Sequence, residues 1–300
     1  MRILITGASG FVGREVVPLL LGAGAEVHTL GRSSVDRAGV IHHPVDLLAG
    51  VDSHMIQVIG ATHLIHLAWA AKPGFWGAAE NLDWVAASIG LVRAFGVGGG
   101  QRAVIAGSCA EYDWTGWGRL DEATSPILPA TLYGTAKASL HTVLTKAAPK
   151  LGISLAWARI FFPYGPGERP ERLLGALLDA ARRGDVAKVS EGSQRRDFIH
   201  VEDVAAALVA ILAAPVEGAL NVASGKATTV RRFVEIATEA VGTADSVSYG
   251  ALPPRSNDPP LIEGAINRLL TETAYRPRFT LATGVADAVA RFRFLEETRC

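Results

Sequence analysis

The chain has 300 residues with balanced charge, 29 Lys+Arg against 29 Asp+Glu. Hydrophobic residues make up 49% of it and charged residues 19%, which excludes intrinsic disorder, because disorder needs low hydrophobicity and high net charge. Balanced charge provides no global positive field, so we expect no nucleic-acid partner. Two cysteines, Cys109 and Cys300, cannot form a disulfide framework, and we expect a cytoplasmic protein.

Two features of the sequence argue against a membrane protein. The longest apolar stretch, residues 204–215, is shorter than the ~20 residues that a bilayer-spanning helix needs. The apolar run at residues 3–5 is too short for the core of a signal peptide. We therefore expect no membrane partner.

Strand and helix patterns alternate over the first two-thirds of the chain. Short apolar runs closed by Gly, Ser or polar residues predict buried strands at residues 2–6, 26–30, 63–68, 103–106 and 154–159. Apolar residues at helical spacing predict helices at residues 11–21, 81–95 and 131–148. This alternation predicts an α/β fold with a doubly wound, parallel Rossmann sheet covered on both faces.

The pattern changes at Tyr164, where glycines and prolines cluster. Three helices and one strand are expected beyond it: helices at 171–183, 201–212 and 230–241, and a strand at 219–223. We predict two interleaved domains. The larger Rossmann domain would take residues 1–163 plus 201–224, and the smaller C-terminal one residues 164–200 plus 225–300.

A glycine-rich segment follows the first predicted strand. Gly7, Gly10 and Gly13 match G-x-x-G-x-x-G, and a helix is expected to begin near Phe11. Glycines let the backbone approach a pyrophosphate, and a helix N-terminus offers unpaired N–H groups and a positive dipole end. A strand before and a helix after the segment favour a dinucleotide site over an ordinary Gly-rich turn.

The end of the second predicted strand bears on which dinucleotide is bound. An acidic residue here would hold a ribose 2′-OH, but the chain has Arg32 after Gly31, and Glu26 and Asp36 lie too far away. An arginine can hold a 2′-phosphate through a charge-assisted fork. We therefore predict NADP, with NAD as the alternative and a merely surface-covering Arg32 as the other interpretation.

Three polar residues form a candidate catalytic group. Tyr133 and Lys137 are one helical turn apart on one face. A nearby ammonium favours phenolate, so we expect a lowered Tyr133 pKa and a phenol that exchanges a proton at working pH. Ser108 ends a predicted strand, where open α/β sheets place ligands. Its hydroxyl can bind a carbonyl oxygen beside the phenol, although a capping role is equally plausible for Ser108 taken alone.

Together these motifs resemble the extended short-chain dehydrogenases/reductases, the NAD-dependent epimerase/dehydratase proteins that act on nucleotide sugars. The matching segments cover nearly the whole chain: residues 6–13, His66-Leu-Ala68, Ser108, Tyr133-x-x-x-Lys137, Tyr164-Gly-Pro166 and residues 196–203. The resemblance implies that the larger domain binds NAD(P) and the smaller one a nucleotide-diphosphate sugar.

The resemblance also implies individual roles. Lys137 would bind the nicotinamide ribose, Asp46 and Leu47 would lie near adenine, and Arg196 and Arg255 would grip the substrate diphosphate, because arginine pairs bidentately with phosphate. Two solvated arginines are the alternative. The expected cofactor-binding residues are Gly7, Ser9, Gly10, Phe11, Val12, Gly13, Arg32, Asp46, Leu47, Leu67, Ala68, Tyr133 and Lys137.

The sequence departs from the family pattern at two places, both expected to contact substrate. Many members have an Asn where this chain has Phe162. The 4,6-dehydratases carry Asp-Glu directly after the Ser/Thr, whereas this chain has Cys109 and Ala110. Elimination across C5–C6 would lack its acid/base pair here. Glu111, one residue further on, is expected to point elsewhere.

Histidines and aromatic residues add two weaker patterns. His63 and His66 lie on a predicted strand, where residues three apart point to opposite faces, and no Cys or Glu completes a ligand set. We therefore predict no metal. Five aromatic residues would either pack on a sugar or base face or cover the sheet: Trp69, Phe75, Trp76, Trp114 and Trp117.

The resemblance and the departures together predict an NADPH-dependent reductase of the C4 keto group of a nucleotide-linked 4-keto-6-deoxy sugar. Ser108, Tyr133 and Lys137 would be its catalytic residues. The first alternative is an NAD-dependent nucleotide-sugar 4-epimerase with the same residues. The second is a non-catalytic NADP sensor, although such relatives lose the Tyr–Lys pair. The family's helix pairing also implies a homodimer through residues 81–95 and 131–148.

Overall fold

A parallel sheet of seven strands forms the centre of the computed structural model, which describes residues 1–116, 118–253 and 258–297. Every neighbouring pair of strands is parallel. In order across the sheet, the strands are β3 (Val40–Pro44), β2 (Glu26–Gly31), β1 (Arg2–Thr6), β4 (His63–His66), β5 (Arg102–Ser108), β7 (Ser154–Ile160) and β12 (Gly218–Val222). The predicted doubly wound Rossmann fold is confirmed.

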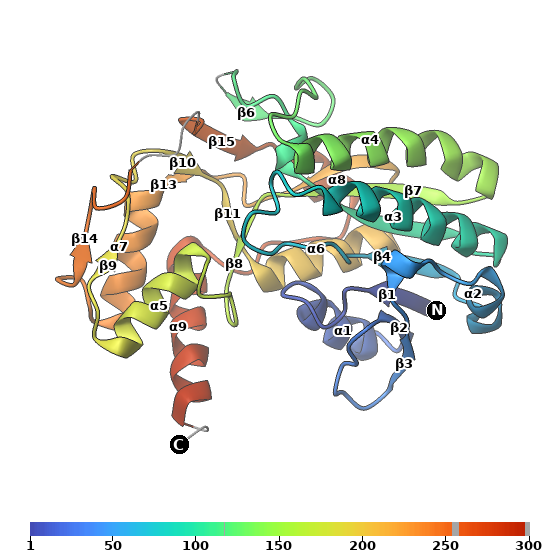
Figure 1. Cartoon of the computed structure of the whole chain (residues 1–300), viewed down its shortest axis with the longest axis horizontal. Coiled ribbons are helices and arrows are strands. Elements are labelled where there is room, and N and C mark those ends of the chain that lie inside the picture. Colours follow the sequence, from blue (N-terminus) through green and yellow to red (C-terminus); the bar gives the residue numbers. More distant parts are fainter. Residues whose placement is uncertain (117, 254–257, 298–300) are drawn as a thin grey trace.

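Helices cover both faces of this sheet (Figure 1). One face carries α1 (Gly13–Gly22) and α6 (Val201–Ala213), which pack together. The other carries α2 (Ser53–Ile59), α3 (Glu80–Val97) and α4 (Leu132–Ala147). Successive side chains of β1 point to opposite faces of the sheet, so this strand contributes to the hydrophobic core on both faces. Ile3 and Ile5 belong to the core beneath α1 and α6, whereas Leu4 belongs to the core beneath α3 and α4.

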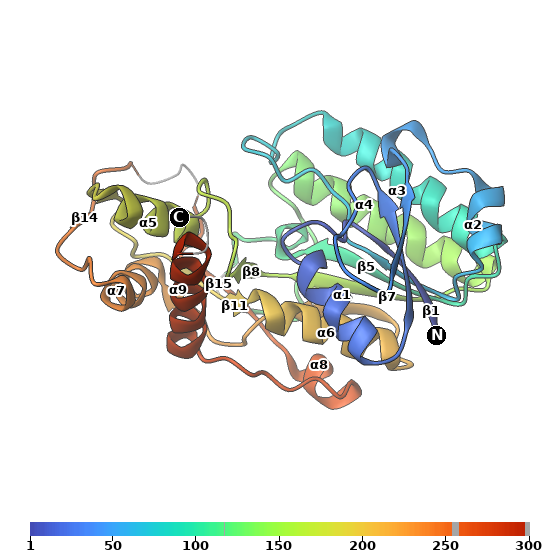
Figure 2. The same cartoon turned by 90° about the horizontal axis from the view of Figure 1, so that it is seen from below.

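The smaller part of the molecule gathers its helices beside the sheet rather than over it (Figure 2). Its helices α5 (Leu173–Arg183), α7 (Val230–Val241) and α9 (Leu281–Glu297) share a separate hydrophobic core. The other elements are short: η1 (Leu47–Ala49), η2 (Cys109–Glu111), β6 (Arg119–Leu120), η3 (Ala148–Leu151), β8 (Phe162–Tyr164), β9 (Ala187–Lys188), β10 (Arg195–Arg196), β11 (Phe198–His200), β13 (Thr228–Thr229), β14 (Val247–Ser248), β15 (Leu261–Gly264) and α8 (Asn267–Glu272). The domain boundaries stay a prediction, which this separate core supports.

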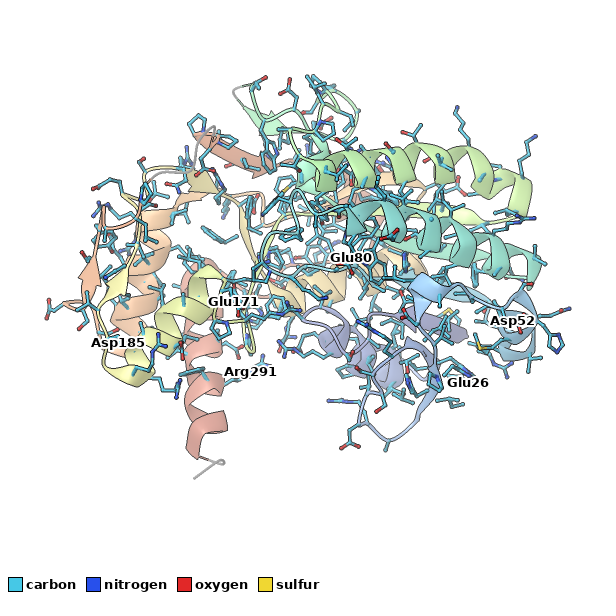
Figure 3. The ribbon with its side chains drawn as sticks, in the orientation of Figure 1. Glu26, Asp52, Glu80, Glu171, Asp185 and Arg291 are labelled. Atoms are coloured by element: carbon cyan, nitrogen blue, oxygen red, sulfur yellow. The ribbon has the colours of Figure 1, made fainter. Side chains whose placement is uncertain are left out.

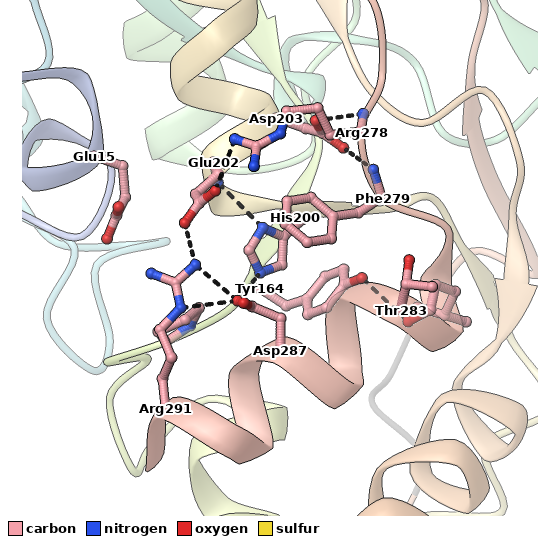
Figure 4. Close-up of polar contacts among 12 residues, drawn as sticks. Glu15, Tyr164, His200, Glu202, Asp203, Arg278, Phe279, Thr283, Asp287 and Arg291 are labelled. Atoms are coloured by element: carbon pink, nitrogen blue, oxygen red, sulfur yellow. Dashed lines mark hydrogen bonds and ion pairs between the residues drawn. The ribbon is translucent and has the colours of Figure 1, made fainter. Parts of the chain in front are cut away.

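A polar cluster joins the two parts (Figure 4). Glu202, in the first turn of α6, pairs with Arg291 of α9 and with Arg278 at 3.1 Å. Asp203 accepts backbone hydrogen bonds from Arg278 at 2.9 Å and Phe279 at 3.1 Å. These contacts fix α9 against the end of the sheet. Figure 3 shows the length of the whole molecule, with Asp185 at one end and Asp52 near the other.

The carboxyl ends of β1 and β4 meet where the strand order reverses. Thr6 pairs with His66 across these strands, and the chain leaves β1 and β4 toward opposite faces. In open α/β sheets this switch point is where ligands bind. Within the described residues, no helix is both long and apolar enough to span a bilayer.

Candidate active site

The glycine-rich segment lies directly against the end of β4. Gly7 has φ +70°, and a Cβ there would lie 2.9 Å from the Leu67 carbonyl carbon and 2.7 Å from the Ala68 nitrogen. A Cβ on Gly13 would collide with the Gly7 carbonyl oxygen. Side chains are therefore excluded where the backbone turns into α1. Two predicted cofactor segments, residues 7–13 and 67–68, come together here and form a cradle of closely packed backbone, the kind of backbone that could hold a pyrophosphate.

The predicted adenosine-side residues follow β2 and β3. Arg32 comes directly after Gly31, is exposed, and makes no hydrogen bond or ion pair with other residues in the described ranges. Asp46 uses its carboxylate to cap η1, accepting from the Leu48 N–H at 3.1 Å. Leu47 is buried. Arg32 is thus available to an anion at this sheet edge, whereas the Asp46 carboxylate already has a backbone partner.

A chain of buried hydrogen bonds runs beneath the cradle. The Ala68 N–H donates to Thr6 Oγ1 at 3.3 Å, and Thr6 Oγ1 lies 2.6 Å from His66 Nδ1. His66 Nε2 lies 2.8 Å from Ser88 Oγ, which donates to the Trp84 carbonyl. Burial, together with the smaller effect of the Lys137 charge, lowers the pKa of His66 to about 3. Both ring nitrogens of this neutral histidine have hydrogen-bond partners, which connect β1, β4 and α3.

Ser108 sits at the carboxyl end of β5, where the chain turns into η2. Its Oγ accepts a hydrogen bond from the Ala110 N–H at 3.1 Å. Because that bond uses a lone pair, the hydroxyl proton is free to be donated. Ser108 also lies close enough to the Tyr133 phenol to lower its pKa. Capping and a functional role are therefore compatible for this residue.

Tyr133 and Lys137 project from the first two turns of α4, which begins after the capping residue Thr131. The Tyr133 N–H donates to the Trp76 carbonyl at 3.0 Å, and Lys137 Nζ donates to the Ala106 carbonyl at 2.8 Å. The first bond holds the start of α4 against the loop that contains Trp76, and the second holds Lys137 against β5, the strand that Ser108 ends. The structure thus brings the three predicted catalytic side chains to one edge of the sheet.

The charge state of this group differs from the sequence-based expectation. Burial raises the pKa of the Tyr133 phenol, although Ser108 and Arg172 act in the opposite direction. Burial also lowers the pKa of Lys137 to about 7, partly offset by the Glu111 anion. Desolvation disfavours both charged forms, so the expected lowering of the Tyr133 pKa is wrong for this structure. Tyr133 is a neutral proton donor here.

Aromatic side chains surround the phenol, a feature for which sequence reasoning left two uses open. The rings of Phe75 and Trp76 lie nearly perpendicular to the Tyr133 ring, with centroids 4.9 and 5.5 Å away. Trp69 lies at 6.2 Å and carries the Lys137 ammonium 3.7 Å above its ring. Trp114 contacts Trp76 at 6.1 Å. The fifth aromatic residue of that group, Trp117, lies outside the described residues.

Comparison with known proteins places this arrangement in a family. The family model described as "NAD dependent epimerase/dehydratase family" matches residues 3–223, well over half of the chain. The chain belongs to this family. The family depends on a nicotinamide dinucleotide and acts on nucleotide sugars, so the chain is a nucleotide-sugar enzyme of the extended short-chain dehydrogenase/reductase type.

Individual relatives of this family enzyme are distant but match along most of their length. A UDP-glucose 4-epimerase of Corynebacterium glutamicum is 26% identical over 97% of this chain and 95% of its own. A dTDP-6-deoxy-L-talose 4-dehydrogenase (NAD(P)(+)) of Kitasatospora kifunensis is 27% identical over 84% and 83%. The structure of Thermus thermophilus UDP-glucose 4-epimerase with NAD has a TM-score of 0.86 at 26% identity, covering 98% of this chain and 99% of that one.

The described residues that were predicted to contact substrate lie on η2, β8 and β10. Cys109 is buried, its burial raises the pKa of the thiol, and it neighbours Tyr133. Phe162, on β8, lies 5.7 Å from the Arg196 guanidinium. Arg196 is itself buried and donates to Asp258 Oδ1 at 2.5 Å. The predicted partner Arg255 lies outside the described residues.

Proposed function

We propose that this chain is an NADPH-dependent reductase of the C4 keto group of a nucleotide-diphosphate 4-keto-6-deoxy sugar. The observation that carries the proposal is the grouping of Ser108, Tyr133 and Lys137 beside the glycine cradle. The replacement of the dehydratase acid pair by Cys109 and Ala110 argues against elimination chemistry. Relatives named as 4-dehydrogenases of a dTDP-6-deoxy sugar catalyse, by name, the reverse of this reduction.

Each catalytic residue has a role that its contacts support. Bound NADPH would supply the hydride. Ser108 keeps its hydroxyl proton for the substrate oxygen, because its lone pair already accepts from the backbone. Tyr133 is a neutral donor and would protonate the alkoxide as it forms. Lys137 is held at the Ala106 carbonyl and would bind the nicotinamide ribose.

The aromatic residues around Tyr133 support a substrate with an apolar ring face. Phe75 and Trp76 lie next to the phenol, and a deoxy sugar offers C–H groups to aromatic rings. Apolar walls also exclude water from the reacting carbonyl. A substrate diphosphate would lie toward Arg196 and Arg255, with Cys109 and Phe162 lining the sugar site.

Turnover of NADPH with a panel of nucleotide-linked 4-keto-6-deoxy sugars tests the proposed reductase. We expect net oxidation of added NADPH with at least one of them and slower oxidation of NADH. A second candidate is the 4-epimerase, favoured by the full-length match to UDP-glucose 4-epimerases. An epimerase would interconvert UDP-hexoses without net oxidation of added cofactor. That result would replace the reductase proposal.

A homodimer through α3 and α4 is also part of the proposal. These helices pack side by side and expose the apolar residues Leu82 and Val143. We expect light scattering at micromolar concentration to give twice the 31.6 kDa chain mass, and Leu82→Asp to give the chain mass. Val58→Asp is the matched control, because Val58 is equally apolar and exposed but lies on α2. A monomeric wild type would contradict the dimer.

A further inference from the structure

Glu111 is a fully buried acid directly behind the catalytic serine. It ends η2, and its side chain is completely inaccessible. Oε1 accepts from the Ser108 N–H and from Trp157 Nε1–H, both at 2.8 Å. Oε2 accepts from Arg159 Nε, also at 2.8 Å. The sequence-based expectation that Glu111 points elsewhere holds only for the substrate side, since its carboxylate turns inward beneath Ser108.

Neighbouring strands are built around this carboxylate. Gly107 pairs with Arg159 across β5 and β7, and a Cβ on Gly107 would lie 2.6 Å from Glu111 Oε1. Gly107 thus leaves the room that the carboxylate fills. Arg159 NH1 donates to the Tyr112 hydroxyl at 3.0 Å, which donates to Asn221 Oδ1 at 2.8 Å. The orientation of Glu111 is therefore fixed from β5, β7 and β12.

We propose that Glu111, held by Arg159, is a positioning residue that fixes the turn from which Ser108 presents its hydroxyl to the substrate oxygen. Two bonds define this turn: Glu111 holds the Ser108 N–H, and Ser108 Oγ holds the Ala110 N–H. With both made, the backbone on each side of Ser108 is held, and the hydroxyl keeps its proton for a partner beside Tyr133. The inference rests on the proposed chemistry at Ser108.

A contribution to folding stability alone is a weak explanation for the buried Glu111–Arg159 ion pair. Desolvating two charges is costly, and well-packed apolar residues of similar volume often stabilise a fold as well. A direct bond from the carboxylate to the backbone of a catalytic residue is a specific function that an apolar pair lacks. The test therefore has to separate the bond to Ser108 from the charge pair.

Two double variants make that separation. Glu111→Gln with Arg159→Met removes both charges but keeps an oxygen acceptor for the Ser108 N–H. Glu111→Met with Arg159→Met removes the acceptor as well. We expect the second variant to lose roughly tenfold to a hundredfold in kcat relative to the first, at similar KM and similar NADPH affinity, because small displacements of a catalytic group have effects of this size.

A second measurement, which needs no substrate, accompanies the kinetic comparison. Amide hydrogen exchange at Ser108, measured by NMR, should be faster in the Met double variant than in the Gln one. If the Met variant does not fold, Glu111→Asp replaces it, because a side chain one methylene shorter keeps a charge for Arg159 but cannot also reach the Ser108 N–H. The same loss of kcat and faster exchange are expected.

Tyr112→Phe is the matched control. It removes the hydroxyl at the far side of Arg159 and leaves the Glu111–Ser108 bond in place, so its kcat should stay within about twofold of wild type, as for a change that makes no transition-state contact. Equal kcat and equal Ser108 exchange in the paired variants would overturn the proposal. A wild type inactive on every nucleotide sugar would instead count against the proposed function, since the exchange arm needs no substrate.

Discussion

Tyr133→Phe should lower kcat by about 10²–10⁴-fold, the usual loss when a positioned acid is removed. The phenol would protonate the substrate oxygen in the transition state. The edge contacts of the ring with Phe75 and Trp76 need no hydroxyl, so the site should keep its shape. Steady-state turnover, with NADPH affinity measured by fluorescence titration, checks both parts.

Tyr249→Phe makes the same chemical change away from the site. Tyr249 lies in the smaller part of the molecule, where the Arg231 guanidinium stacks 4.0 Å from its ring, and its variant should turn over at the wild-type rate. If Tyr133→Phe also kept normal turnover, Tyr133 would have no part in the mechanism. A loss of NADPH affinity equal to the loss of kcat would instead indicate a structural role.

Sequence patterns predict most of the central sheet because its strands are buried on both faces. β1 and β7 begin at the residues expected, since their apolar runs are uninterrupted. β3 was not predicted. It is an edge strand whose residues are all half-buried or exposed, with His42 and His43 in place of an apolar run. An edge strand with polar side chains carries no such signal.

The last helix of the chain was missed for a related reason. The buried face of α9 uses small residues, Ala288 and Val289 among them, and it contains Gly284. A Cβ on Gly284 would collide with the Tyr164 hydroxyl. The sequence pattern alone indicates a helix breaker at this glycine. The glycine is required instead by a contact with a residue 120 positions away. Tertiary packing, which the sequence pattern does not contain, decides the element.

The positions of the candidate catalytic residues could be predicted, because a motif fixes their spacing. Their protonation states could not, because these depend on burial. Spacing alone places Tyr133 and Lys137 on one face of a helix. The direction of their pKa shifts depends on burial. Desolvation outweighs the opposing effects of Ser108 and Arg172 on Tyr133 and of Glu111 on Lys137. The contact of Lys137 with the Trp69 ring has no sequence signal at all, since 68 positions separate the two residues.

Arg32→Ala should weaken NADPH binding by roughly tenfold to a hundredfold and leave NADH binding nearly unchanged. A charge-assisted hydrogen bond contributes about 1.5–3 kcal/mol, and only NADPH carries the 2′-phosphate that would accept one. Arg32 lies exposed at the end of β2, so added salt should reduce the difference by screening. Paired titrations of NADPH and NADH on wild type and variant measure it.

Arg37→Ala is the control variant for Arg32→Ala. Arg37 is also exposed on the segment after β2, but it lies five residues further along. A small loss in Arg37→Ala and a large one in Arg32→Ala would localise the phosphate contact to the strand end. Equal losses for both cofactors in Arg32→Ala would contradict a 2′-phosphate contact. A wild type that prefers NADH would do the same, and it would also favour the epimerase, because an enzyme that returns its hydride to the same substrate has no need of the cellular NADPH pool.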